Sequence, residues 1–456
     1  MVDRSAGFRL QQRRREVRGQ IARHGAIDFF NLLSSPELLQ LTEDLQPEHR
    51  ERLYPPTMTL SMFLGQSLHA DRSCQNAVNG WAVQRSVEGL RGCSVRTGAY
   101  CRARQRLPLQ MVSSLVRHSG RLLSGQATRR WNWRGRAVKL VDGTSIGMPD
   151  TAANQASYPQ PHTQAPGLGF PLMRVVGVIC LCSGAVLDVA VGRYAGKGQS
   201  ELSLFRSLLS VLSAGEVLLG DALYCNYFLI ASLQAAGVEV LFEQHASRHT
   251  DFRRGRPLGT RDHQVLWRKP ERPEWMSPEQ YAAMPEQLRV RELKARGRIL
   301  VTTLVKPRSA PRTELTWLYQ QRWNVELDLR NIKITLGLQL LSCKTPQMVH
   351  KELWVYLLGY NLIRMLLAQA AHQAGVLPRQ LSFKHALQIC SHWRSRTVCV
   401  PPERLCELIA QLRVGHRPGR QEPRARKRRP KHYPWLKVPR PKARWQLHMH
   451  GRQLDA

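Results

Sequence analysis

The sequence predicts an α/β domain that lies between two helical regions. Near Ala137 the chain changes from basic, helix-like segments to runs rich in Val, Ile and Leu that are punctuated by glycine, which is typical of an α/β domain. Apolar residues at helical spacing on either side of this part favour helices there. A chain of 456 residues, 43% of them hydrophobic, is long enough for two or three domains with a well-buried core.

The first region, residues 1–130, is expected to be helical and basic. Six arginines stand against two acids in its first twenty residues. Helix-start signals follow at Ser35, Thr59 and Asp71, each before an apolar-periodic run. We therefore expect a separate basic helical domain.

The second region, residues 137–340, contains the predicted sheet. The spacing predicts a strand over 137–146 and a hairpin of strands over 173–182 and 185–193 that turns at Ser183-Gly184. A helix over 199–214, a short strand over 216–220, a helix over 226–236 and a strand over 238–242 follow. Three strands, a helix, a strand, a helix and a strand is the order of a ribonuclease H-like core.

The strand pattern breaks over residues 245–297, which we interpret as an insertion into this core. Basic residues outnumber acids there, and Trp267 and Trp275 are interleaved among them. A strand over 298–304 and a long helix over about 312–335 complete the domain. The C-terminal region, residues 345–412, is predicted to be helical, and residues 413–456 have the basic, proline-containing composition of a disordered arm.

The charge of the chain points to a polyanionic partner. Sixty-eight Lys and Arg against thirty-three Asp and Glu give a formal net charge of +35. Nucleic acid is the leading candidate, because neutralised phosphates release condensed counterions. A membrane surface is the competing polyanion, but the sequence shows no apolar stretch of the roughly twenty residues that span a bilayer.

The cysteines favour an intracellular compartment. None of the ten forms a Cys-x2-Cys pair, and the closest two, Cys180 and Cys182, lie in an apolar run that resembles a buried strand. We expect reduced, structural thiols in a soluble cytoplasmic protein rather than a zinc finger.

Three carboxylates stand where the elements of such a core converge. Asp142 lies in the first predicted strand, Asp221 follows the fourth, and Glu326 lies on the last helix. Carboxylate oxygens suit hard divalent cations, and two such ions about 4 Å apart can promote displacement at phosphorus. Taken singly, each aspartate is more often a turn residue that binds its own backbone, and Glu326 a solvated charge.

The last predicted helix carries a mixed polar stripe. Tyr319, Arg322, Glu326 and Lys333 fall within about 60° of one another on an ideal helix. A phosphodiester site uses each type: Glu for a metal ion, Arg and Lys for phosphate oxygens, and the Tyr hydroxyl for a phosphate. The alternative is a charged helix face on which Arg322 and Glu326 form an i,i+4 pair.

These residues resemble the signature of a family of bacterial transposases. Tyr319-x2-Arg322-x3-Glu326-x6-Lys333, preceded by Asp142 in Val-Asp-Gly-Thr and Asp221 in Gly-Asp-Ala-Leu-Tyr, is similar to the pattern of insertion-sequence transposases of the insertion-sequence-four family. The similarity extends from about Tyr54 to the basic tail. The family has a ribonuclease H-like fold with a β-rich insertion before the last core helix.

The resemblance implies a cut-and-paste DNA transposase of the DDE type. Asp142, Asp221 and Glu326 would hold two Mg²⁺ ions, or Mn²⁺, while Tyr319, Arg322 and Lys333 would contact DNA. The implied partners are the double-stranded transposon ends and the target DNA. A homodimer would bind them in the synaptic complex, and the protein would be cytoplasmic and associated with the nucleoid. Region 1–130 would then bind DNA. Relatives stack a displaced base on a tryptophan of the insertion, for which Trp267 and Trp275 are candidates; a buried anchoring role is the alternative.

Two other functions remain compatible with the residues. A DNA-binding protein that descends from a transposase could keep the fold without catalysis. A nuclease that cuts structured nucleic acid could use the same carboxylates without strand transfer.

Overall fold

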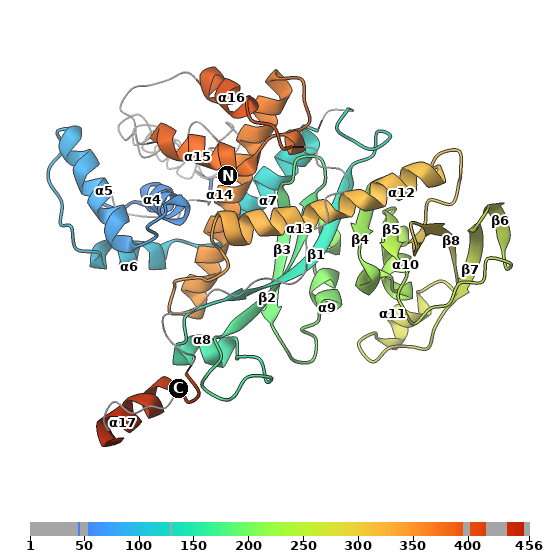
Figure 1. The fold of residues 1–456 in the computed structure, drawn as a ribbon, viewed down its shortest axis with the longest axis horizontal. Coiled ribbons are helices and arrows are strands. Elements are labelled where there is room, and N and C mark those ends of the chain that lie inside the picture. Colours follow the sequence, from blue (N-terminus) through green and yellow to red (C-terminus); the bar gives the residue numbers. More distant parts are fainter. Residues whose placement is uncertain (1–43, 46–52, 128–129, 395–401, 416–435, 451–456) are drawn as a thin grey trace, which may run out of the picture.

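The fold is built on one continuous nine-stranded sheet (Figure 1). The computed structural model describes residues 44–45, 53–127, 130–394, 402–415 and 436–450. Its strands are β1 (Val138–Gly147), β2 (Leu172–Cys180), β3 (Val186–Arg193), β4 (Val217–Gly220), β5 (Glu239–Glu243), β6 (Arg256–Gly259), β7 (Asp262–Arg268), β8 (Gln287–Ala295) and β9 (Arg298–Thr302). They lie in the order β3-β2-β1-β4-β5-β9-β8-β7-β6.

Helices surround this sheet and precede and follow it in the chain. They are α4 (Pro56–Leu68), α5 (Cys74–Val87), α6 (Gly98–Arg106), α7 (Leu109–Gly125), α8 (Ala152–Ser157), α9 (Glu201–Arg206), α10 (Tyr227–Ala235), α11 (Pro278–Ala282), α12 (Arg312–Gln320), α13 (Asn324–Arg330), α14 (Pro346–Gln373), α15 (Phe383–Arg394), α16 (Pro402–Ala410) and α17 (Arg440–His450).

Strands β1 to β5 form the predicted ribonuclease H-like core. Strand β1 pairs antiparallel with β2 and parallel with β4, β2 pairs antiparallel with β3, and β4 pairs parallel with β5. The β2–β3 hairpin turns at the predicted residues, because Gly184 adopts φ +75°, which a glycine tolerates without strain. A side chain at Gly184 would also meet the guanidinium of Arg364. The α/β fold class is therefore confirmed.

The insertion is rich in strands and extends the core sheet. Strands β6, β7 and β8 pair in sequence with one another, β8 pairs with β9, and β9 pairs antiparallel with the core strand β5. The irregular appearance of residues 245–297 in the sequence reflects short strands interrupted by turns and by the one-turn helix α11. The insertion thus shares a sheet with the core.

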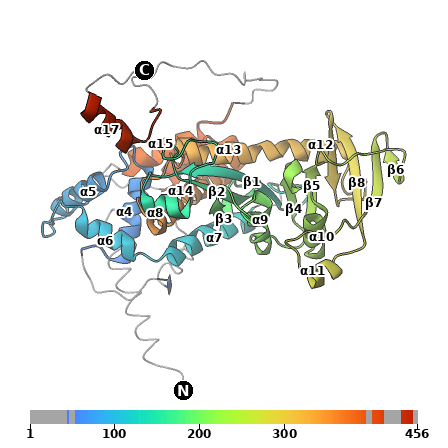
Figure 2. The ribbon, with the colours of Figure 1, turned by 90° about the horizontal axis from the view of Figure 1, so that it is seen from below.

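Two hydrophobic layers cover the two faces of the sheet. On one face, residues such as Leu140 of β1 pack with α7, α12 and α14. On the other face, Val141 of β1, Phe205 of α9 and Ile230 of α10 form a second core that continues into the insertion. Figure 2 shows α12 and α13 along one side of the strands and α10 and α11 on the opposite side. Neighbouring residues of β1 therefore face different layers.

The structure corrects one predicted helix and adds detail to two predicted regions. The helices before residue 130 share the first hydrophobic layer with the sheet, so they do not form a core of their own. The helix expected over 199–214 is shorter: α9 ends at Arg206, and a tight turn at Leu209–Val211 brings Leu208 and Leu212 into the second core. In the arm expected to be disordered, residues 440–450 form α17. The start signal at Ser35 and residues 416–435 lie outside the described residues.

Helix α14 is the central helix of the fold. Among the described residues it alone is long and apolar enough to cross a membrane, but 89% of its apolar window is buried inside the protein. Its apolar character is accounted for by burial against α4, α7, α15 and α16.

Candidate active site

Asp142, within β1, and Asp221, directly after β4, are aligned where the pairing of these two parallel strands ends. The last described pairs of β1 and β4 are Val138 with Val217, Lys139 with Leu218 and Leu140 with Leu219. Asp142 and Asp221 each lie two residues beyond the last of these pairs, so the register aligns them. Both carboxylates are partly buried. The structure therefore brings together the two aspartates that the sequence placed 79 residues apart.

Each aspartate also accepts a local hydrogen bond. Asp142 Oδ1 accepts from the N–H of Gly143 at 2.8 Å, and Asp221 Oδ1 accepts from the N–H of Leu223 at 2.9 Å. The turn role considered from the sequence is thus real, and each carboxylate retains a second oxygen for another ligand.

The Asp142 carboxyl has an unusually high proton affinity. Burial raises its pKa to about 6, and the negative charges of Asp221 and Glu201 act in the same direction. The Gly143 N–H and the Arg322 guanidinium oppose this rise in pKa. A buried carboxyl that is crowded by other carboxylates is stabilised in its charged form by a bound cation.

Glu326 is carried toward β1 by an irregular helical run. The helix predicted over 312–335 is present, but α12 passes through the 3-10 turn Gln321–Trp323 into α13, and α13 passes into the π-turn Asn331–Thr335. Helix α13 packs on β1. Insertions of this kind in a helix are frequent at functional sites, because they change the direction of the side chains that follow.

The four polar residues of this run have different partners. Arg322 donates to Glu326 Oε1 at 3.2 Å, which is the i,i+4 pair considered as an alternative. Tyr319 is buried and donates its hydroxyl to Glu243 Oε2 at 3.1 Å. Lys333 donates to Thr144 Oγ1 at 3.0 Å, two residues beyond Asp142 on the same face of β1. Arg322 and Lys333 thus lie near Asp142, whereas the Tyr319 hydroxyl is directed to the end of β5.

Burial and neighbouring charges shift the pKa values of Lys333 and Arg322. Burial lowers the pKa of Lys333, and no carboxylate of the described residues forms an ion pair with its ammonium group. For Arg322, burial lowers the pKa, but Tyr319, Asp142 and Glu326 outweigh it and raise the pKa above its ordinary value. Arg322 is therefore a fixed positive charge between Asp142 and Glu326.

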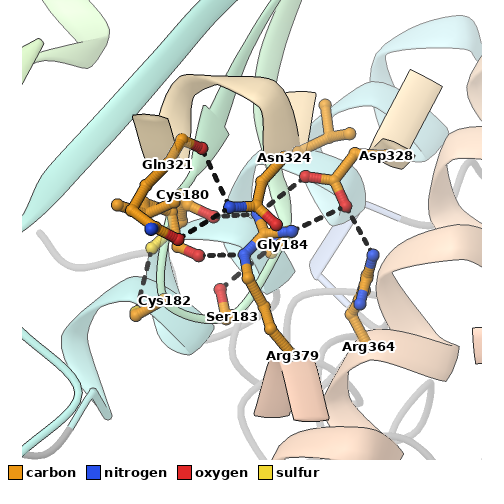
Figure 3. A network of polar contacts seen from close by, with 12 residues as sticks. Cys180, Cys182, Ser183, Gly184, Gln321, Asn324, Asp328, Arg364 and Arg379 are labelled. Atoms are coloured by element: carbon orange, nitrogen blue, oxygen red, sulfur yellow. Dashed lines mark hydrogen bonds and ion pairs between the residues drawn. The ribbon is translucent and has the colours of Figure 1, made fainter. Parts of the chain in front are cut away.

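The opposite side of α13 is anchored by a buried ionic network (Figure 3). Asp328, whose side chain is fully buried, accepts from Arg364 of α14 at 2.5 Å and from Arg379 at 2.7 and 3.1 Å. The Tyr360 hydroxyl donates to the same carboxylate at 3.1 Å. Arg379 also donates to the carbonyls of Cys180 and Leu181 at the β2–β3 turn. The network connects the Glu326 helix to α14 and to the hairpin.

Two further residues belong to this site that the sequence analysis did not single out. The Glu201 carboxylate of α9 lies against Gly143, where a Cβ on Gly143 would stand 2.3 Å from Glu201 Cδ. Tyr224 is fully buried, and its hydroxyl has no hydrogen-bond partner among the described residues. A sequence signal existed for Tyr224 alone, in Gly-Asp-Ala-Leu-Tyr.

The donor set of the site suits a hard cation. Its ligand atoms are carboxylate oxygens, and the described residues offer no cluster with the cysteine or histidine ligands of a zinc site. In this conformation no three acidic, histidine or cysteine side chains of the described chain converge on one point. Glu326 is held by Arg322, so a cation that used all three predicted carboxylates would compete with that ion pair.

The two tryptophans of the insertion differ in exposure. Trp267 is buried in the second core and donates to Glu292 Oε1 at 2.7 Å, with Arg248 stacked 3.6 Å from its ring centre. Trp275 is 47% exposed and carries Arg206 at 3.8 Å over its ring. The anchoring role fits Trp267, and only Trp275 offers a ring to solvent.

Comparison with known proteins identifies relatives that match most of the chain. The sequence pattern of the family described as "Transposase DDE domain" matches residues 133–362, about half of the chain. The chain is 29% identical over 417 residues to "Transposase InsG for insertion sequence element IS4" of Escherichia coli (strain K12), covering 88% of this chain and 91% of that protein. A cryo-EM structure of the piggyBac transposase synaptic complex with hairpin DNA aligns over 87% of both chains with 10% identity and a TM-score of 0.43.

Proposed function

The chain belongs to the transposase DDE domain family, and from this premise we propose that it excises and inserts a DNA element by cut-and-paste phosphoryl transfer. Members of such a family cut and join DNA strands with the help of divalent metal ions. The proposed reaction proceeds in three steps. The protein cleaves the end of the element, a hairpin then forms at that end, and the reopened end is transferred to target DNA.

Asp142, Asp221 and Glu326 are the residues that would hold the metal ions. The observation that carries this assignment is the register of β1 and β4, which aligns the two aspartates beneath the helix that bears Glu326. Two bound Mg²⁺ or Mn²⁺ ions would activate the attacking oxygen and stabilise the leaving oxygen at phosphorus. The raised pKa of Asp142 supports the choice, since a cation offsets the cost of its buried charge.

Arg322 and Lys333 would hold the scissile phosphate. Arg322 can release Glu326 to a cation and turn its planar donors to phosphate oxygens. Lys333, which pairs with a neutral hydroxyl, can give its charge to a phosphate without breaking an ion pair. Tyr319 would contact DNA only after its hydroxyl exchanges Glu243 for a phosphate.

The partner is double-stranded DNA, first the element ends and then the target. The net charge of +35 supports strong, salt-sensitive attraction to phosphates. Arg102 and Arg106 are exposed on one side of α6, whereas Arg104 between them is buried, so α6 presents a basic edge that can contact the duplex. We further propose that two copies pair the two ends.

The experiment is cleavage of labelled DNA that carries the inverted repeats flanking the gene. With Mg²⁺ the wild-type chain should nick the end, form a hairpin and join it to target, and EDTA should abolish all three. Glu326→Gln should bind DNA but lose cleavage by at least a hundredfold, which is about 2.7 kcal/mol of activation free energy. Glu314→Gln, which changes an exposed carboxylate on α12, is the matched control. Binding without cleavage by wild type would indicate a non-catalytic descendant, and nicking without joining a nuclease.

A further inference from the structure

The site contains a carboxylate that approaches the aspartates from the other side of the sheet. Leu140 faces the first hydrophobic layer and Val141 the second, so alternation along β1 turns Asp142 toward α13 and Gly143 toward α9. Glu201 is the first residue of α9. Its carboxylate fills the space above Gly143, with both oxygens within 2.7 Å of the place where a Cβ would lie. Only glycine permits this approach.

Glu201 has no partner that accounts for its position. Its carboxylate forms no hydrogen bond or ion pair with the described residues; the nearest positive charge that acts on it is Arg174, whose guanidinium is engaged with the Gln199 carbonyl at 3.0 Å. Burial raises its pKa, and the charge of Asp221 raises it further. Burial and a neighbouring negative charge thus both disfavour the ionised form of Glu201, and a bound cation would offset that cost.

A buried hydroxyl marks the same place independently. Tyr224 is fully inaccessible to solvent and its hydroxyl is unpaired in the described structure. Its ring packs edge-on against Phe205, which lies one turn after Glu201 on α9. Burial raises the pKa of Tyr224, and the charges of Glu201, Asp142 and Asp221 raise it further. An unpaired buried hydroxyl is rare in folded proteins, and it is typical of a site completed by another group.

We propose that Glu201 is a fourth carboxylate of the active site, which a divalent cation draws together with Asp221 and Asp142, and that Gly143 is the residue that allows its approach. In the present conformation these three carboxylates do not converge on one point. The inference rests on the proposed metal site and adds a ligand to it. Asp142 faces the α13 side of β1 and Glu201 the α9 side. A cation beside β1, beyond the end of β4, would therefore be enclosed from both faces.

The alternative role of Glu201 is a purely structural one. An acidic residue in the first turn of a helix interacts favourably with the helix dipole. In that case Glu201→Gln would lower stability slightly and leave cation binding unchanged. If Glu201 is a ligand, the same change would raise the melting temperature in EDTA, because it removes repulsion between carboxylates, and would weaken cation binding.

The test measures Mn²⁺ binding by the full chain without DNA, from the loss of the EPR signal of free Mn²⁺. Glu201→Gln should raise the Kd about tenfold or more, the effect usual for the surroundings of a metal. Gly143→Ala should do the same by displacing the carboxylate. In the double variant Gly143→Ala/Glu201→Ala the clash disappears, so its Kd should equal that of Glu201→Ala. Glu274→Gln, an exposed carboxylate, should bind as wild type.

The outcomes separate this inference from the function on which it rests. If Asp142→Asn loses Mn²⁺ binding but Glu201→Gln and Gly143→Ala bind as wild type, the fourth carboxylate is refuted and the metal site stands. If Asp142→Asn also binds as wild type, the metal assignment itself fails. Additive effects of Gly143→Ala and Glu201→Ala would show that Gly143 acts by another route, which would overturn its assigned role.

Discussion

The buried network behind the helix that carries Glu326 offers the sharpest test of how the candidate site is supported. Asp328 follows Glu326 by two residues and faces the opposite way, where it pairs with Arg364 and Arg379 (Figure 3). It also accepts a hydrogen bond from the Tyr360 hydroxyl. Asp328→Asn preserves the shape of the side chain and one acceptor oxygen but removes its charge. The two guanidinium groups, of which Arg364 is 4% exposed and Arg379 17% exposed, would then lack a counter-charge.

The expected cost follows from the burial of these groups. Breaking a buried ion pair by removal of one partner typically destabilises a protein by about 3–5 kcal/mol, because an uncompensated charge remains inside. The matched control is Glu314→Gln, which breaks the pair between Glu314 and Arg134, both about 40% exposed. An exposed pair contributes about 0–1 kcal/mol. The two isosteric substitutions, which lie on one helical run, should therefore differ by several kilocalories per mole in their effect on the free energy of unfolding.

Urea unfolding followed by tryptophan fluorescence measures this difference. With a slope of about 3 kcal/mol per molar urea, Asp328→Asn should lower the midpoint by about 1 to 2 M, whereas Glu314→Gln should leave it nearly unchanged. An Asp328→Asn midpoint within error of wild type would refute the reasoning, since it would mean that the network adds no net stability. Equal losses in both variants would show that burial does not govern the cost.

Two other predictions concern the site itself. Lys333→Ala should retain DNA binding and first-strand nicking but impair hairpin formation, measured as the ratio of hairpin to nicked product on a denaturing gel; equal loss at every step would contradict its role. Asp142 should make the metal-free protein less stable as pH rises. Its folded pKa of about 6 exceeds the ordinary value of 3.8, so folding takes up a proton between these values, and the stability present below about pH 4 is lost through pH 6. Asp142→Asn should lack this loss. In EDTA, the free energy of unfolding of Asp142→Asn relative to wild type should therefore rise between pH 4.5 and 7.5, by on the order of 2 kcal/mol. A difference in unfolding free energy that stays constant with pH would argue against the raised pKa of Asp142.

Local patterns predicted much of the core because they depend on neighbouring residues. The alternation and the Ser183-Gly184 turn located the β2–β3 hairpin, and the short apolar run before Asp221 located β4. The Tyr319-to-Lys333 spacing identified the helix of the site. The prediction of one regular helix was wrong, because the 3-10 and π turns depend on how α12 and α13 pack on the sheet.

The insertion illustrates the limit of such patterns. Its strands, of four to nine residues, carry many charged side chains, so their alternation is weak in the sequence. They form because β9 presents an edge to which β8 pairs, and the sheet then grows outward to β6. The buried position of Trp267 follows from this pairing, which places it against Leu288 of β8.

The sequence alone predicted the class of the fold, DNA as a partner and three candidate acidic residues, because composition, periodicity and motif spacing are properties of the chain itself. The tertiary structure decided which charges meet. Glu201 lies against β1 only because Gly143 has no side chain, and Asp328 contacts arginines 36 and 51 residues further along the chain. Such contacts depend on strand register and on the packing of two layers, and neither can be predicted from the spacing of residues along the chain.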